Sequence, residues 1–560
     1  MLKPLPLPPL EQTLDKFLDA IQPVFDSKLN ETAKEITYSF KEKQGANRQK
    51  QLSEYAKIQA KQGKSWLSDF WLEGYLVGRQ PKALSSNAGC QINYTTDKTD
   101  FPRAAQLIHC LVITHRNFID GRIGPTTDNR NNPLSMDGWK TLTGAMRHPQ
   151  EKCDSYYYSN KGINNRHISI FWQGHHYLLP VTDAQGNVFS VQAIEKALLT
   201  LPQTDKPVIL PFTAISALSS TDASQQLNDL CQNTHNATVY NTLKDSLFCF
   251  SLYHSGDDEL SQLVTQSFFP AHAWQYKPFT YQMDLDSNYL SLHIEHTGLD
   301  GGTINDILSY AFEQSVVEET TETTELKLLD WQMTPIQSQT IHNLLKPIED
   351  SAKKIAIRQF TVDYSPIKTK VSHDALFQFS LIYAQLKVFN ELKNTYEAVD
   401  TRNFLAGRTE CLRSNTMQAK NLAEKLLLNT ATTDDLTNAL TAHKSWVIAC
   451  KTGQGIDRHL YALKEICTEY DDVSQKFFEL VDKFAGKDFL STSTVGGQYP
   501  IHRVLFFPTS QGGFGVNYSI NNPYYEFCLT ADAISANKLD EMQQAIQEGA
   551  KKLIDMVALM

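Results

Sequence analysis

Runs of alternating apolar and polar residues, the pattern of a half-buried β-strand, occur in two separate parts of the chain. The first set lies before residue 300 and the second lies after residue 485, with a series of long amphipathic helical patterns between them. A chain of 560 residues is also too long for one ordinary domain. We therefore predict two α/β units of similar size.

The predicted elements follow from these periodicities. Strand patterns lie at residues 167–172, 177–180, 247–253, 279–283, 289–296, 489–493, 503–507, 515–520 and 526–529. Helical patterns lie at residues 10–21, 30–62, 103–118, 134–146, 191–201, 335–354, 373–392, 415–428, 433–449, 456–466, 472–484 and 535–557. Residues 318–324 are rich in Glu and Thr, which is typical of a surface loop or linker.

The composition is that of an ordinary globular protein, with 41% apolar and 20% charged residues. The net charge of −10, without a dense block of Arg and Lys, argues against binding to nucleic acid. The nine cysteines form no Cys-x-x-Cys pair, which favours a reducing compartment. No stretch has the apolar length of a signal peptide or a membrane span, so we expect a cytoplasmic protein without a transmembrane segment.

Residues 290–303, LSLHIEHTGLDGGT, are the strongest candidate for a catalytic corner. Apolar and polar residues alternate up to Ile294, and the chain then enters His296 and a glycine-interrupted turn. An imidazole at a strand end, with the carboxylate of Asp300 four residues on, suits general-base catalysis. On spacing alone, a histidine in this position is more often a structural or surface residue.

A metal site is not predicted. His293 and His296 lie three residues apart on a strand and therefore point to opposite faces. The pair His175 and His176 has no clustered partners in the sequence.

The catalytic corner and several other segments resemble landmarks of the carnitine/choline acyltransferase family. The segments similar to that family, in the family's order, are Leu5–Leu14, Pro133–Met136 with Trp139 and Arg147–Pro149, Glu295–Gly301, Thr395–Glu397 with Thr401–Phe404 and Gly407–Glu410, Asp457–Leu460 with Leu463 and Lys464, Leu490–Ser493 and Gly513–Val516. Taken alone, the His-x-x-x-Asp-Gly element would equally resemble the wider coenzyme A-dependent acyltransferases.

The resemblance implies two pseudo-symmetric α/β domains, each built like chloramphenicol acetyltransferase, with an active-site tunnel at their interface. The domain that carries the catalytic histidine would span residues 71–333. The second domain, which would carry the carnitine site, would be discontinuous and comprise residues 1–70 and 334–560.

The reaction that the resemblance implies is reversible transfer of an acyl group between the thiol of coenzyme A and the hydroxyl of carnitine. His296 would act as general base in a direct transfer, since the sequence has no Gly-x-Ser-x-Gly and no Cys beside a His in these segments. Asp300 would orient the imidazole, and it could also cap the helix that follows. Ser493 would stabilise the oxyanion of the tetrahedral intermediate.

The family match also implies a carnitine site. Arg458 would bind the carboxylate of carnitine with its planar fork, and Tyr396 and Thr409 would add hydroxyl donors. Ser491 is a further candidate, and Phe507 would offer an aromatic face to the quaternary ammonium. The choline-specific branch of the family has no Arg at the position of Arg458, so carnitine is the predicted acceptor.

For coenzyme A, Lys368 and Asp374 resemble residues that the family uses, and Lys370 could add a phosphate contact. Tyr364 stands where the family has another lysine, which points to weaker affinity or a different acyl carrier. A bulky Leu505, on the strand after Ser-Thr-Ser, would block a long acyl chain and favour short ones.

Two other functions stay open at this point: transfer to choline or another acceptor, and a non-catalytic, ligand-binding relative that retains the fold. We expect no tightly bound cofactor, with coenzyme A or acyl-coenzyme A as co-substrate. The expected partners are carnitine and acyl-coenzyme A, and the expected oligomeric state is a monomer.

Overall fold

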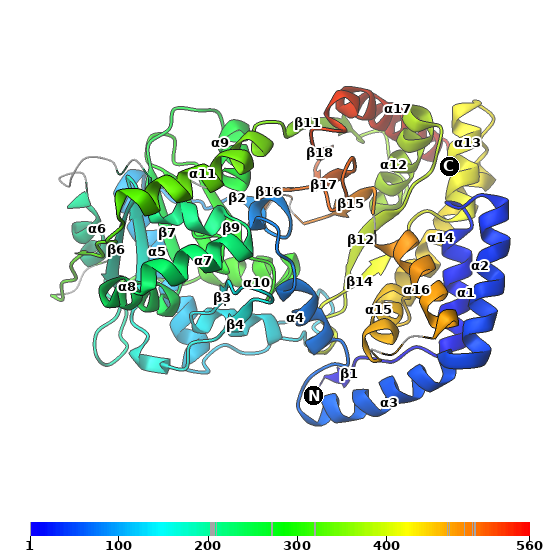
Figure 1. The fold of residues 1–560 in the computed structure, drawn as a ribbon. Coiled ribbons are helices and arrows are strands. Elements are labelled where there is room, and N and C mark those ends of the chain that lie inside the picture. Colours follow the sequence, from blue (N-terminus) through cyan, green and yellow to red (C-terminus); the bar gives the residue numbers. More distant parts are fainter. Residues whose placement is uncertain are drawn as a thin grey trace.

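The computed structural model describes residues 2–201, 208, 210–269, 273–318, 321–467, 469, 471–486, 488–495, 497 and 500–560. Two β-sheets, each covered by helices, form two lobes that lie side by side (Figure 1). The two-domain α/β architecture is therefore as predicted.

The sheet of the first lobe has eight strands. In spatial order they are β10 (Lys327–Leu328), β6 (His175–Pro180), β5 (His167–Trp172), β7 (Cys249–Tyr253), β8 (Phe279–Asp284), β9 (Leu290–Ile294), β2 (Ala88–Ile92) and β16 (Ile501–Phe506). The helices of this lobe are α5 (Asp100–Ile119), α6 (Val191–Leu198), α7 (Ser220–Cys231), α8 (Thr234–Asp245), α9 (Glu259–Phe268), α10 (Gly301–Phe312) and α11 (Pro335–Ala352).

The sheet of the second lobe has six strands. In spatial order they are β11 (Ala356–Asp363), β18 (Tyr524–Ala531), β17 (Phe514–Asn521), β15 (Leu490–Ser493), β12 (Thr395–Asp400) and β14 (Thr409–Leu412). The helices of this lobe are α1 (Leu10–Ile21), α2 (Ser27–Phe40), α3 (Ala46–Lys61), α4 (Ser68–Leu76), α12 (His373–Phe389), α13 (Met417–Leu427), α14 (Thr433–Lys451), α15 (Asp457–Glu465), α16 (Asp472–Ala485) and α17 (Leu539–Ala558).

Short elements complete the chain. The two small sheets pair β1 (Lys3–Pro4) with β13 (Phe404–Leu405), and β3 (Met146–His148) with β4 (Ser155–Tyr157). The 3₁₀ helices are η2 (Lys82–Leu84), η3 (Asp137–Thr143), η4 (Gly162–Asn164), η6 (Phe212–Ala217) and η7 (Ala536–Lys538), and η1 (Lys41–Gly45) is a π-helical turn between α2 and α3.

The two lobes repeat one arrangement of strands. Strands β5, β7 and β8 run parallel, with β6 and β9 antiparallel on either side. Strands β12, β15 and β17 do the same, with β14 and β18 on either side. His296 is the second residue after β9, and Ala533 holds the equivalent place after β18. The repeated topology thus presents an imidazole at this strand end in the first lobe and a small apolar side chain in the second.

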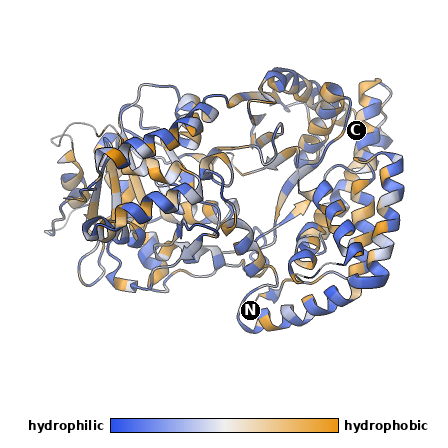
Figure 2. Cartoon of the chain, viewed as in Figure 1, coloured by the Kyte–Doolittle hydropathy of each residue, from blue (hydrophilic) through white to orange (hydrophobic). Residues whose placement is uncertain are grey.

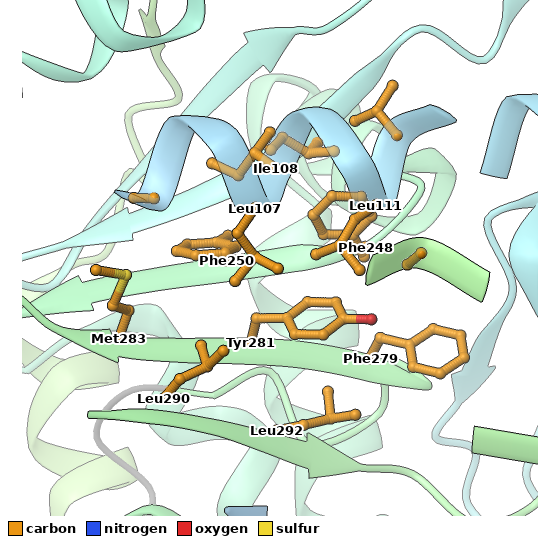
Figure 3. Packing of buried hydrophobic residues seen from close by; sticks show 14 of the residues in the cluster. Leu107, Ile108, Leu111, Phe248, Phe250, Phe279, Tyr281, Met283, Leu290 and Leu292 are labelled. Atoms are coloured by element: carbon orange, nitrogen blue, oxygen red, sulfur yellow. The ribbon is translucent and has the colours of Figure 1, made fainter. Parts of the chain in front are cut away.

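The core of the first lobe shows why the periodic patterns predict these elements. Leu107, Ile108 and Leu111 recur at helical spacing on α5 and are buried. Figure 3 shows them packed over apolar side chains of the sheet, among them Phe250 and Tyr281. Figure 2 shows hydrophobic residues along the inner sides of helices in both lobes, with hydrophilic residues outside.

Strand β16 belongs to the first lobe although its neighbours in sequence, β15 and β17, build the second sheet, and helix α11 also packs in the first lobe although β11 follows it. Strand β16 pairs with β2 of the first sheet, and α11 buries Ile341 and Leu345 among residues of the first lobe. The chain reaches the second sheet only at β11. The predicted domain boundary near residue 333 stays a prediction. Two segments that follow this residue, α11 and β16, lie in the first lobe.

The prediction of an α-helix over residues 134–146 is wrong. This stretch forms the short 3₁₀ helix η3, and strand β3 begins at its end. Gly144 ends η3 with a left-handed φ of 95°, which breaks the helical path. Within the described residues, no helix has both the length and the apolar character needed to cross a membrane.

Candidate active site

His296 lies just beyond the end of β9, at the corner that the sequence indicates. Its ring stacks on that of Tyr75, with 5.8 Å between centroids and 6° between planes. The Tyr75 hydroxyl is 3.3 Å from His296 Nδ1. The ring's polar contacts with the described residues use Nδ1, and 30% of the side chain is exposed. The other nitrogen, Nε2, has no hydrogen bond to the described residues.

Asp300 binds an arginine more closely than it binds the imidazole. Its Oδ1 lies 3.7 Å from His296 Nδ1, beyond hydrogen-bonding distance. Arg408 donates through Nε to Oδ2 (2.5 Å) and through Nη2 to Oδ1 (3.1 Å). Burial opposes ionisation of Asp300, but the Arg408 guanidinium and His296 hold its pKa below the ordinary value.

The predicted capping role of Asp300 is wrong. Asp300 is the residue before α10, yet its side chain makes no capping hydrogen bond to the helix. The carboxylate instead makes two hydrogen bonds to the Arg408 guanidinium, in which both partners are charged, whereas a backbone N–H at the helix end carries no full charge.

Arg408 joins the catalytic corner of the first lobe to the second lobe. Besides Asp300, it donates to the carbonyl of Thr297 at 2.8 Å and to that of His296 at 3.3 Å. Arg402, from the same β12–β14 region, binds Asp306 of α10 at 2.6 Å. Two arginines of the second lobe therefore hold the residues that follow His296.

The pair Gly301 and Gly302 allows this close approach. A Cβ on Gly301 would lie 2.3 Å from the side chain of Val495, and one on Gly302 would lie 2.7 Å from Arg402. Val495 follows β15 closely, and its backbone N–H donates to Ser493 Oγ at 3.3 Å. The partly exposed Ser493 thus lies two residues from the contact with the start of α10.

Three of the predicted acceptor-site residues meet in the second lobe. Arg458 Nη2 donates to the Tyr396 hydroxyl at 2.9 Å, and its Nε donates to the Thr409 carbonyl at 3.0 Å. Ser491 lies beside Tyr396 in the parallel pairing of β12 with β15. The spacing of these residues along the chain does not show this proximity, but the sheet register produces it.

Trp71 connects the acceptor-site cluster to the catalytic corner. The centroid of its ring lies 4.0 Å from Arg458 Cζ and 5.7 Å from Arg408 Cζ. The predicted site residues do not include Trp71, Tyr75 or Arg408. The available signals are the aromatic run at residues 66–75 and the GRTE segment at residues 407–410.

Glu410 is a buried carboxyl group beneath Arg458. Its Oε1 accepts hydrogen bonds from the backbone N–H groups of Cys411 (2.8 Å) and Arg458 (3.2 Å). Burial raises the pKa of Glu410 to about 7, although Arg458 favours its charged form. The charge beside the acceptor site therefore changes near neutral pH.

The predicted coenzyme A residues lie on the segment between β11 and α12 and at the start of α12. Lys368 and Lys370 are exposed, and Lys368 Nζ donates to the Ser365 carbonyl at 2.7 Å. Both carboxylate oxygens of Asp374 have partners, namely His443 Nε2 and the Tyr518 hydroxyl, each at 3.1 Å. These contacts leave the predicted binding of coenzyme A untested.

Leu505 and Phe507 share one apolar cluster with Leu263, Phe268 and Tyr289. Leu505 is only 1% exposed. In the described part of the chain, the aromatic rings found over Arg458 are those of Trp71 and Tyr396. The predicted roles of Leu505 and Phe507 stay predictions.

Two cavities lie away from this constellation. One of about 260 Å³ is lined by Trp172, His175 and His254 at the ends of β5 and β7. The other, of about 1110 Å³, is lined by Lys393, Lys420 and neighbouring residues of the second lobe. His296 and Arg458 line neither cavity, so the predicted tunnel between the lobes stays a prediction.

A sequence model of the family described as choline/carnitine O-acyltransferase matches residues 5–548. Carnitine O-acetyltransferase of Columba livia is 25% identical, over 99% of this chain and 93% of its own. Mitochondrial carnitine O-palmitoyltransferase 2 of Bos taurus is 22% identical, over 98% of this chain and 91% of its own. Among solved structures, the trichothecene 15-O-acetyltransferase TRI3 of Fusarium sporotrichioides aligns with a TM-score of 0.42 and 8% identity, over 86% of this chain and 94% of its own.

Proposed function

This chain belongs to the choline/carnitine O-acyltransferase family, and from that premise we propose that it transfers a short acyl group reversibly between coenzyme A and carnitine. Membership makes it an acyltransferase, with acyl-coenzyme A as co-substrate. The acceptor, the acyl length and the roles of individual residues belong to the proposal.

His296 acts as the general base. Its Nε2 takes the proton of the carnitine hydroxyl as the oxygen attacks the thioester carbonyl. A tetrahedral intermediate forms, and the Ser493 hydroxyl donates to its oxyanion. When the intermediate collapses, the carbon–sulfur bond breaks and the departing thiolate takes the proton from His296. No covalent acyl-enzyme is needed, because both substrates react directly.

Asp300 and Tyr75 stabilise the charged imidazole from its other side. Nδ1 faces the Tyr75 hydroxyl at 3.3 Å and the Asp300 carboxylate at 3.7 Å. A proton on Nδ1 leaves Nε2 unprotonated and ready to act as a base. Arg408 keeps Asp300 ionised, so a negative charge remains near the ring throughout the transfer.

The observation that best supports carnitine as the acceptor is the cluster of Arg458, Tyr396 and Thr409. A guanidinium carries five N–H donors, and its contacts with the described residues use Nε and one N–H of Nη2. The remaining donors can bind a carboxylate with two parallel hydrogen bonds. Choline has no carboxylate and would leave these donors unused.

The preference for short acyl groups is proposed because Leu505, a large side chain buried on β16, would block a long acyl chain. Lys368, Lys370 and Asp374 are proposed to bind coenzyme A, and Ser491 and Phe507 to line the carnitine site. A cytoplasmic location and a monomeric state also stay proposals. The relatives named above include acetyl and palmitoyl transferases, so family membership leaves acyl length open.

The test is release of free thiol from acetyl-coenzyme A. We expect release only when carnitine is present, and near-complete loss in His296→Ala. Choline should be a poor acceptor for the wild type and a relatively better one for Arg458→Asn. A wild type that prefers choline would contradict the assignment of the acceptor.

A different acyl carrier is the second candidate, favoured by Tyr364. Its ring stacks on Tyr525 with centroids 4.5 Å apart, at the position where the family resemblance implies a phosphate-binding lysine. Comparing acetyl-coenzyme A with its 3′-dephospho form tests this reading. Equal KM values would favour a donor site that does not recognise the 3′-phosphate. Calorimetry that finds binding of carnitine without binding of coenzyme A would instead favour a non-catalytic relative.

A further inference from the structure

Arg147 lies fully buried against the corner that carries His296, and its side chain is 0% exposed. Its hydrogen bonds run from Nε to Asp154 Oδ2 (2.7 Å), from Nη1 to Thr297 Oγ1 (3.1 Å) and Glu295 Oε1 (3.5 Å), and from Nη2 to the carbonyls of Tyr75 (2.8 Å) and Gly78 (3.2 Å). These contacts use all five donors of the guanidinium.

The partners of Arg147 include both chain neighbours of His296 and the backbone of Tyr75. Glu295 and Thr297 stand on either side of His296 in the chain, and Thr297 Oγ1 also donates to Glu295. Tyr75 is the residue on which the imidazole stacks. One planar group therefore binds both the corner that carries His296 and the end of α4 that carries Tyr75.

We propose that Arg147 is a positioning residue for His296. By binding both the 295–297 corner and the end of α4, Arg147 fixes the position of the imidazole relative to Tyr75. This inference rests on the proposed function, since it concerns the base of that reaction. Arg147 touches no group that we assign to the substrates.

The local charges explain why an arginine can be buried here. Carbonyl groups at a helix C-terminus carry partial negative charge, and Arg147, Lys82 and Arg79 all donate to carbonyls at the end of α4. Asp154 binds both Arg147 and Arg79 at 2.7 Å. The carboxylates of Asp154 and Glu295 both pair with the buried Arg147 and offset its charge.

A lysine cannot replace this geometry. It keeps the positive charge but offers three donors on a flexible stem, so it cannot reach both carbonyls of α4 and both residues of the corner in one plane. Because displacement of a catalytic group by about 1 Å can cost about 100-fold in rate, the Arg147→Lys variant separates charge from positioning.

The experiment measures carnitine binding by calorimetry and acetyl transfer by thiol release on the same Arg147→Lys preparation. We expect one binding site per chain and a carnitine KM within about threefold of the wild type. We expect kcat, counted per carnitine-binding site, to fall about 100-fold. A purely structural role would reduce the number of binding sites in proportion to the lost activity.

Arg79→Gln is the matched control. Arg79 binds the same Asp154 and the same helix end, but its hydrogen bonds go to the carbonyls of Leu76, Val77 and Gln150 and not to the corner. Its kcat per site should stay within about threefold of the wild type.

Thr297→Val provides a second route if Arg147→Lys does not fold. It removes the hydroxyl that accepts from Arg147 and keeps the side-chain shape, so we expect kcat to fall about tenfold at an unchanged carnitine KM. The inference is overturned if the folded variant of Arg147, or Thr297→Val in its place, keeps the kcat of the wild type per binding site. If the wild type itself shows no carnitine-dependent thiol release, it is the proposed function that fails.

Discussion

Replacing Arg458 by Met removes the donors proposed for the carboxylate of carnitine while keeping an unbranched side chain beneath Trp71. The guanidinium lies 4.0 Å from the centroid of that ring and Arg458 is half-buried; bound carnitine would cover it further, so water would screen its pairing with the carboxylate poorly. Truncating one partner of a buried, hydrogen-bonded charge pair costs about 2–5 kcal/mol. At about 1.4 kcal/mol per tenfold change, kcat/KM for carnitine should fall by about 30- to 4000-fold.

The assay compares carnitine with carnitine methyl ester, which keeps the hydroxyl and the trimethylammonium group but has no negative charge. The wild type should strongly prefer carnitine, and Arg458→Met should lose most of this preference. Arg458 also binds the Tyr396 hydroxyl and the Thr409 carbonyl, so its replacement also removes these two structural contacts. Equal losses for the two acceptors would show the removal of these contacts to be the whole effect and would refute the carboxylate assignment.

Three further results are expected. His296→Ala should lower kcat by about 1000-fold at a nearly unchanged carnitine KM, measured by thiol release, because it removes a general base; a small loss would exclude this role. Burial raises the pKa of Glu410 from 4.5 to about 7, so its stabilising effect is complete below pH 4.5 and is lost as the pH rises to 7. Between pH 4.5 and pH 7, the unfolding free energy of the wild type, measured by urea titration, should therefore fall by about 3 kcal/mol relative to that of Glu410→Gln. If the unfolding free energies of the two proteins change with pH in parallel, the pKa shift is contradicted. Leu505→Gly should raise activity with long-chain relative to acetyl donors in an acyl-length profile, and an unchanged profile would place the acyl group elsewhere.

Elements with complete local patterns could be predicted from the sequence. Strand β5 matches residues 167–172, and β8 extends the predicted stretch by one residue. Strand β11 is not among the predicted elements, because this strand is mostly half-exposed and has no sharp apolar alternation. Strands β12 and β14 are also not among the predicted elements. Both are short, and they lie in the stretch whose residues are assigned to the carnitine site by family resemblance and not to secondary structure by periodicity.

The site shows the same division between local and long-range information. The corner at His296 follows from a strand pattern and a glycine-rich turn within one short stretch. Its partner Tyr75 is 221 residues away, and only the packing of α4 against the corner brings the two rings together. The capping role predicted for Asp300 fails because Arg408, 108 residues on, offers a stronger partner than the adjacent helix. Local rules are most often overridden at such functional positions.

Strand β16 also limits how the enzyme can turn over. It departs from the second lobe and forms a backbone ladder with β2, so drawing the lobes apart would break that ladder and leave β2 with an unpaired edge. A cycle of wide hinge opening and closing is therefore costly for this chain. Under the proposed function, acceptor and donor would reach His296 without wide separation of the lobes, so the space between the lobes would keep its width during turnover.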